Sequence, residues 1–288
     1  AAPRLFERAS LAAALRAQDD REQAERRAEQ AASLDEDGRA LSFTALDTYA
    51  RCPARYRYRY VLGLPELAPA APPRLVDRGD AYDDAIGADE YGTLIHLALE
   101  RYNRRRVEGL PADLLQAFEA QIGELGLRSR IAPARLAAAR SALQAYLRHP
   151  IAQARVLGAE VAFNIDFAGV TVRGAVDLVA ELGEQALIVD YKTGAGPTGH
   201  YALQLAIYRE AARHIFGERD WQSRLLILRD GDAHELQLPE IDAAARVSEL
   251  ASGIARLEFA PSPGAGCAAC PFRAQPCTAS NEPPGNFR

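Results

Sequence analysis

Residues 159–194 read AEVAFNIDFAGVTVRGAVDLVAELGEQALIVDYKTG, and this stretch decides the fold. It contains three short runs, 159–167, 169–180 and 185–191, which are rich in β-branched residues and separated by glycines. Runs of this kind are typical of strands in an antiparallel meander. The stretch therefore predicts three consecutive strands.

The residues on either side have helical patterns. A helix is predicted from Gly92, two more within 111–148, and another over 200–216, before a further strand at 223–229. Helix, three strands, helix and strand is an order that predicts an α/β domain with a mixed sheet flanked by helices.

Acidic residues and a lysine gather at the ends of two of these strands. Asp190 and Lys192 are two residues apart, so they share one face of the strand while Tyr191 points to the other. If the second and third strands form a hairpin, Asp177 reaches the same face. Two converging carboxylates repel each other unless a cation lies between them, and oxygen ligands suit Mg²⁺ or Mn²⁺. Such an ion could activate water against a phosphodiester, with the lysine stabilising the developing charge.

Lys192 is also unusual in the composition. Lysine and arginine together number 34, and Lys192 is the single lysine among them. A chain that otherwise uses arginine for positive charge indicates a need for a compact ammonium at this position. An Asp-x-Lys at a strand end is nevertheless equally compatible with an ordinary exposed ion pair.

Several motifs together resemble the PD-(D/E)XK nuclease superfamily in its RecB-like branch, over about residues 41 to 280. They are Gly92-Thr-x-x-His96, Gly174-Ala-Val-Asp177, Ile188-Val-Asp190-Tyr-Lys192-Thr-Gly194 and Gln204-Leu-x-x-Tyr208. The resemblance implies a restriction-endonuclease-like core in which His96, Asp177, Asp190 and the backbone carbonyl of Tyr191 hold Mg²⁺ or Mn²⁺. It also implies that Lys192 is catalytic and that Gln204 and Tyr208 support the site or contact DNA. Glu160 matches an acidic residue often found on the first strand.

The four cysteines fall in two places: Cys52, followed by proline, and Cys267, Cys270 and Cys277 within CAACPFRAQPC. This spacing is compatible with one metal centre that Cys52 completes, and on spacing alone zinc is slightly favoured over an iron-sulfur cluster. Two disulfides are a third alternative, but nothing in the sequence indicates secretion. The pattern resembles the iron-sulfur staple of AddB-type nucleases and their CRISPR-associated relatives, which implies a structural 4Fe-4S cluster with four thiolate ligands.

The domain organisation follows from the resemblance. Residues 1–40, rich in Ala, Arg, Glu and Gln, are expected to form a helical extension or linker, and residues 41–288 a nuclease domain closed by the four-cysteine site. Because the chain opens with Ala1 and has no methionine, we expect the C-terminal nuclease domain of a helicase-nuclease that processes DNA breaks. The alternatives are a stand-alone single-strand exonuclease, a CRISPR-adaptation nuclease, and a catalytically silent DNA-binding module.

The partners expected are DNA, single-stranded or at an unwound end, and a helicase domain or subunit. The net charge of -5 argues against a protein that coats nucleic acid, but arginines cluster at 51–59, interleaved with tyrosines, and at 101–106. Either cluster could grip phosphates or form a solvated helix face. The sequence has no P-loop, no apolar run long enough for a membrane span and no signal peptide, so a cytoplasmic protein without its own ATPase is expected.

Overall fold

The computed structural model describes residues 40–66, 88–126, 131–167, 169–194, 199, 201–273, 276–277 and 279. The helical extension expected before residue 40 lies outside these residues. The chain divides into two compact units. The first comprises Ala1–Pro69, Asp166–Val172 and Leu250–Arg288, and the second comprises Ala70–Ile165 and Arg173–Glu249.

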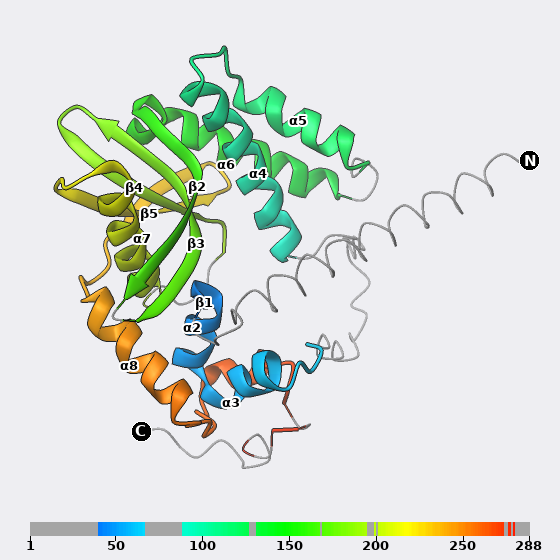
Figure 1. The fold of residues 1–288 in the computed structure, drawn as a ribbon. Coiled ribbons are helices and arrows are strands. Elements are labelled where there is room, and N and C mark those ends of the chain that lie inside the picture. Colours follow the sequence, from blue (N-terminus) through cyan, green and yellow to red (C-terminus); the bar gives the residue numbers. More distant parts are fainter. Residues whose placement is uncertain are drawn as a thin grey trace, which may run out of the picture. The chain divides into compact units, whose positions relative to one another are not determined.

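The second unit contains most of the regular structure (Figure 1). Its helices are α4 (Ala88–Val107), α5 (Leu114–Glu124), α6 (Pro133–Arg148), the short 3-10 helix η2 (Pro150–Gln153) and α7 (Tyr201–Phe216). Its strands are β4 (Gln185–Lys192), β5 (Trp221–Arg229) and β6 (Asp232–Leu236), with the greater part of β2 (Arg155–Phe167) and β3 (Val170–Leu182).

The strands form one mixed sheet that begins with β1 (Ala40–Ser42), in the order β1-β3-β4-β5-β6, with β2 paired to β3. β3 and β4 are antiparallel, and the pairing of Leu182 with Gln185 leaves a turn of two residues. Gly183 begins that turn with a φ of 60°, a conformation that glycine adopts without steric cost. β5 lies parallel to β4, which requires a crossover, and α7 supplies it.

Helices of the second unit cover both faces of this sheet (Figure 1). Alternate side chains of β5 show the division: Leu226 and Leu228 pack in a core with α4, α5 and α6, whereas Leu225 and Ile227 pack with Leu205 of α7. Successive side chains of a strand point to opposite faces of the sheet, so one strand contributes to two cores only when both faces are covered. The fold class predicted from the sequence is thus confirmed.

Local signals explain where several helices begin. Asp113 accepts a hydrogen bond from the Gln116 backbone N–H at 3.0 Å and so caps α5, and α6 starts with Pro133 in its first turn. The predicted helices and strands of the second unit are confirmed with small differences in their bounds. Strand β6 was not predicted from the sequence.

The first unit is built from short elements near the two ends of the described chain. They are β1 (Ala40–Ser42), α2 (Phe43–Arg51), α3 (Pro53–Tyr56), the π-helix η1 (Arg57–Val61) and the 3-10 helix η3 (Ala265–Ala269). Ser42 caps α2 by accepting from the Ala45 N–H at 3.1 Å, as its position predicts. Helix α8 (Ala243–Ala255), also not predicted, contributes residues to both units.

Aromatic side chains hold these segments of the first unit together. The Tyr49 hydroxyl donates to the Glu258 carbonyl at 2.9 Å, the Tyr56 ring stacks on Phe259, and the Tyr58 ring lies 5.4 Å from that of Phe272. Tyr49 and Tyr56 are almost fully buried. Packing in the interior of the first unit is therefore the role observed at Tyr49 and Tyr56.

Candidate active site

Asp190 and Lys192 lie at the end of β4, on the face that α7 covers. The Lys192 Nζ is 2.6 Å from the Asp190 Oδ2 and 4.8 Å from the centre of the Tyr201 ring of α7. Tyr191, between them, is buried in the core on the opposite face. The alternation expected from the sequence is therefore present, and the ion pair is not an exposed one, since Asp190 is fully buried.

Asp177 comes from the neighbouring strand. The register of β3 and β4 pairs Leu178 with Val189, so Asp177 and Asp190 stand one residue further along. The Tyr191 backbone N–H donates to the Asp177 Oδ2 at 2.9 Å. The hairpin thus brings the two carboxylates to one strand end, as the sequence predicts.

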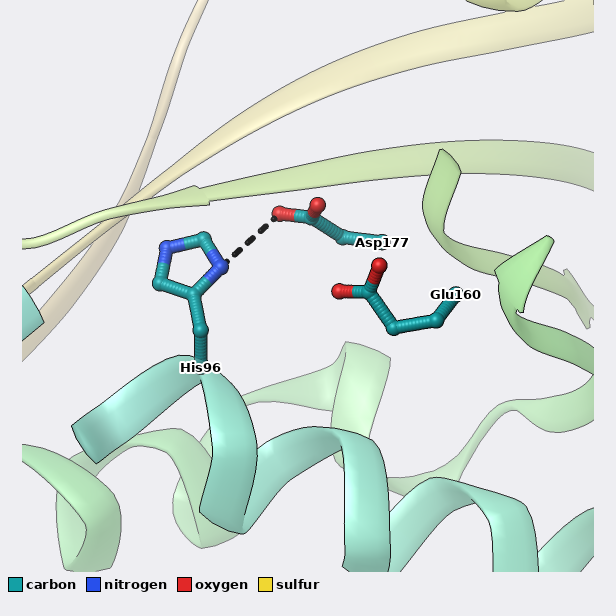
Figure 2. A group of neighbouring side chains, drawn as sticks. All are labelled: His96, Glu160 and Asp177. Atoms are coloured by element: carbon teal, nitrogen blue, oxygen red, sulfur yellow. Dashed lines mark ion pairs between the residues drawn. The ribbon is translucent and has the colours of Figure 1, made fainter. Parts of the chain in front are cut away.

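A third strand and a helix complete the group (Figure 2). His96 of α4, Glu160 of β2 and Asp177 each offer a ligand atom, and these atoms all lie within 4.8 Å of one another. Figure 2 shows the His96 imidazole and the Glu160 carboxylate both turned toward Asp177, with the His96 Nδ1 3.4 Å from the Asp177 Oδ2. One imidazole and two carboxylates form a donor set suited to a hard divalent cation that also accepts nitrogen.

Glu160 stands in a conformation that side chains rarely adopt. Its backbone φ is 48°, inside a strand whose other residues need no such value. A left-handed non-glycine residue costs about 1–3 kcal/mol and persists only where the surrounding structure imposes it. In this strand it turns an acidic side chain toward Asp177 (Figure 2).

Burial makes these acids hard to ionise without a cation. It raises the pKa of Glu160 to about 7, and repulsion from Asp177 adds to the effect. The pKa of Asp190 is raised to about 7 by burial and by Asp177, and that of Asp177 to about 6 by burial despite the nearby Lys192. Burial and the Lys192 charge lower the pKa of His96, so its imidazole is neutral at pH 7 and keeps a nitrogen lone pair for a metal.

A buried chain of hydrogen bonds fixes the Tyr191 side chain, on the face of β4 opposite to Asp190 and Lys192. The Tyr191 hydroxyl lies 3.3 Å from both the Asn103 Nδ2 and the Tyr146 hydroxyl. Arg106 donates to the Asn103 Oδ1 at 3.1 Å and to the Ala154 carbonyl at 2.5 Å. The sequence analysis missed this chain, although the two-residue alternation already placed Tyr191 opposite the acidic face.

Gln204 and Tyr208 project from successive turns of α7, and both are buried. The Gln204 Nε2 donates to the Tyr208 hydroxyl at 2.7 Å. Burial raises the pKa of Tyr208 far above its ordinary value, and the charges of Asp177 and Asp190 raise it further. The pair therefore lies within electrostatic range of the carboxylates, which is compatible with the supporting role that the family motif implies.

The arginine clusters are largely engaged within the protein. Arg51 pairs with Asp47, and Arg55 and Arg59 both pair with Glu66. In α4, Arg101 pairs with Glu124, Arg104 with Glu100, and Arg105 donates to the Pro111 carbonyl at 2.6 Å. Phosphate binding by either cluster stays a prediction, and any such contact would have to replace these partners.

The four cysteines lie in the first unit and line one pocket, together with Tyr58 and Ser262. Cys52 stands at the junction of α2 and α3, Cys267 within η3, and Cys270 and Cys277 in the turns that follow. All four are free thiols, so the disulfide alternative receives no support.

An assembled metal site is not shown at these cysteines. A tetrahedral zinc site with Zn–S bonds of about 2.3 Å would place sulfurs roughly 3.8 Å apart. Among the described residues, no three cysteine sulfurs lie within 4.8 Å of one another. Burial raises the pKa of Cys270, and Cys52 and Cys267 raise it further, so these thiols are near enough to interact.

Fold and site together define a class of protein: a nuclease of the restriction-endonuclease type, with two carboxylates and a lysine at adjacent strand ends. The sequence model of the PD-(D/E)XK nuclease superfamily matches residues 40–275. The chain belongs to this superfamily, whose members use divalent metal ions and act on DNA.

The solved structures that are similar to this chain include the following two. One is the crystal structure of SSO0001, with 22% identity, a TM-score of 0.33, and coverage of 64% of this chain and 85% of that one. The other, from Eubacterium rectale, is named "Putative exonuclease" and has 12% identity, a TM-score of 0.47, and coverage of 90% and 92%. A comparison with curated proteins gives no match.

Among the described residues, no helix combines the length and the apolar character needed to cross a membrane.

Proposed function

We propose that this protein is a metal-dependent deoxyribonuclease that hydrolyses phosphodiester bonds of DNA. The observation that carries the proposal is the convergence of His96, Glu160 and Asp177 within 4.8 Å, beside a buried Asp190. The family to which the chain belongs supports it.

The residues present fit a divalent cation. The Asp190 Oδ1 has no hydrogen-bond partner among the described residues, and Oδ2 lies 2.6 Å from the Lys192 ammonium. A buried carboxylate in that state is costly unless a further positive charge reaches it. Mg²⁺ or Mn²⁺ would be held by His96, Asp177, Asp190 and the Tyr191 carbonyl, and Glu160 is a candidate for the same group.

The chain's own groups divide the chemical work. When bound, the ion would polarise the phosphodiester and make a water molecule easier to deprotonate. Burial lowers the pKa of Lys192, but Asp190 and Asp177 raise it more strongly, so the ammonium stays charged. From its position beside Asp190 it can orient the attacking water or stabilise the charge that grows on the phosphate oxygens. Gln204 and Tyr208 close the side of the site that faces α7.

Substitution of the carboxylates tests this proposal. We expect Asp190→Asn and Asp177→Asn each to reduce release of labelled nucleotides from DNA to the level seen after chelation of the metal, with the fold intact by circular dichroism. The control is Asp232→Asn, an exposed carboxylate of β6. Cleavage by Asp190→Asn at the wild-type rate would refute the assignment.

We further propose an exonuclease that acts on a single-stranded or unwound DNA end, as the nuclease domain of a helicase-nuclease in DNA break processing. The resemblance of its motifs to RecB-like nucleases supports this reading, and a stand-alone exonuclease and a CRISPR-adaptation nuclease are the alternatives. A catalytically silent DNA-binding module is disfavoured, because the acidic residues and Lys192 are all present. Assay on circular and linear single strands tests the requirement for an end.

We also propose that Cys52, Cys267, Cys270 and Cys277 together bind one 4Fe-4S cluster. Support comes from the shared pocket, the absence of disulfides among them, and the resemblance to AddB-type nucleases. Free thiols and a DNA substrate also fit a cytoplasmic location. Protein purified without oxygen should contain about four irons per chain. Stoichiometric zinc without iron would show that the four cysteines bind zinc and not an iron-sulfur cluster.

A further inference from the structure

A polar hollow lies beside the metal-ligand group in the second unit. It is lined by side chains of α4 between Leu97 and Arg105, by Glu108 just after that helix and by Gln121 of α5. Three arginines of α4 contribute to it, Arg101, Arg104 and Arg105. Guanidinium groups in an open polar hollow are suited to planar, bidentate recognition of phosphate.

The hollow begins one helical turn from His96. Glu100 follows His96 by four residues and Arg104 follows by eight, so the three stand on successive turns along one side of α4. The charges of the hollow reach the metal ligands: Glu100 raises the pKa of both Glu160 and Asp177, whereas Arg104 lowers that of Glu160. Arg104 is thus a cation within electrostatic range of Glu160, two helical turns from His96.

Arg104 is held in a way that allows it to change partner. Its Nη2 lies 2.7 Å from the Glu100 Oε1, and 57% of its side chain is exposed. Ion pairs this exposed contribute little to stability, so exchange for a phosphate costs little. Arg106 differs, because its bonds to Asn103 and the Ala154 carbonyl are part of the partly buried support of Tyr191.

We propose that Arg104 is the core of a phosphate subsite, in which it binds a backbone phosphate of the DNA strand next to the scissile bond. In the free protein the Arg104 guanidinium pairs with the Glu100 carboxylate, and the incoming phosphate takes the place of that carboxylate. Arg101, already in a bidentate pair with Glu124 at the edge of the hollow, adds positive charge. The proposal rests on the proposed nuclease function and names how that site orients its substrate.

Binding measurements test the subsite separately from catalysis. The full chain is titrated against a labelled single-stranded oligothymidylate with Ca²⁺ in place of Mg²⁺, over a range of salt concentrations. We expect Arg104→Ala to weaken binding about tenfold and to lower the salt slope by about one. We expect Glu100→Gln to tighten binding, since it frees the guanidinium and removes a negative charge near the phosphate. Arg155→Ala, which removes a 75% exposed arginine paired with Glu181, is the matched control.

Oligonucleotides in which a single phosphate is made neutral then show which phosphate contacts Arg104. Oligonucleotides with one methylphosphonate at successive positions should show one position at which the wild-type protein loses affinity and Arg104→Ala loses none. If Arg104→Ala behaves like Arg155→Ala, or if no such position exists, the subsite is refuted. Because these readouts do not require cleavage, failure of the nuclease assignment would be seen instead in the Asp190→Asn assay.

Discussion

Asp190 shows how the site departs from the ordinary rules for a protein interior. Its carboxylate is fully buried, and Oδ1 has no hydrogen-bond partner among the described residues. Lys192 compensates part of the charge at 2.6 Å, and burial together with Asp177 still raises the pKa of Asp190 to about 7. A group in this state destabilises the metal-free fold, and a bound cation would relieve the cost.

The first prediction for a single residue concerns the size of the cationic group of Lys192. We expect Lys192→Arg to reduce cleavage by roughly 10²–10³-fold, the scale for losing one preorganised donor to the transition state. The planar guanidinium cannot fit the space of a compact ammonium between Asp190 and the Tyr201 ring. Single-turnover cleavage of labelled DNA measures the loss, and Arg155→Lys is the reverse exchange at an exposed position. Retention of most activity would mean that Lys192 supplies charge alone.

At the scale of elements, α4 contributes to two parts of the site. His96 faces Asp177, and Glu100 and Arg104 follow on the next turns and line the hollow. Asn103 donates to the Tyr191 hydroxyl, and Arg106 donates to Asn103. Since the Tyr191 backbone N–H donates to Asp177 and its carbonyl is a proposed metal ligand, support of this side chain positions both neighbours in the strand.

Removal of one hydroxyl tests this support. We expect Tyr191→Phe to weaken Mn²⁺ binding about tenfold, the scale for loss of a group that orients metal ligands. The unfolding free energy should fall by about 1–3 kcal/mol, because Asn103 and Tyr146 lose a buried partner. Calorimetric titration with Mn²⁺ gives the affinity. Tyr102→Phe is the control, since that tyrosine packs beside Tyr146 outside the chain of hydrogen bonds. Equal Mn²⁺ affinity in wild type and Tyr191→Phe would reduce the network to a stabilising role.

At the scale of the whole molecule, the two candidate centres belong to different units. The acidic residues and Lys192 lie in the second unit, and the four cysteines lie on the two terminal segments of the first. A four-cysteine centre would therefore crosslink Cys52 to residues more than two hundred positions away, which restricts the unfolded chain.

Substitution of one cysteine tests whether the cysteine centre of the first unit and the acidic site of the second unit are independent of each other. We expect Cys52→Ala to lose iron and to lower the melting temperature of one calorimetric transition, while the affinity of the second unit for Mn²⁺ is unchanged. Ser262→Ala, which alters the same pocket without removing a thiol, is the control and should keep its iron. A melting temperature equal to that of wild type in iron-free Cys52→Ala would show that the centre does not stabilise the fold.

Local patterns in the sequence were sufficient for a large part of this protein. The alternation Asp190-Tyr191-Lys192, the caps at Ser42 and Asp113, and the apolar periods of the helices depend on neighbours in the chain, so they can be read without a fold. The same holds for the strands and for the fold class. β6 was missed because it is short and largely exposed. α8 was missed although its amphipathic pattern is as clear as that of the predicted helices.

Only the tertiary structure decided which distant residues meet. Strand pairing set Asp177 beside Asp190, and packing of α4 against the sheet brought His96 to Glu160. The same packing enclosed Asn103 with Tyr191 and paired Arg104 with Glu100 beside the site. Such contacts depend on register and on the close packing of side chains from separate elements, which no window of sequence contains. The residue types of the site were therefore legible in the sequence, and their common geometry was a product of the fold.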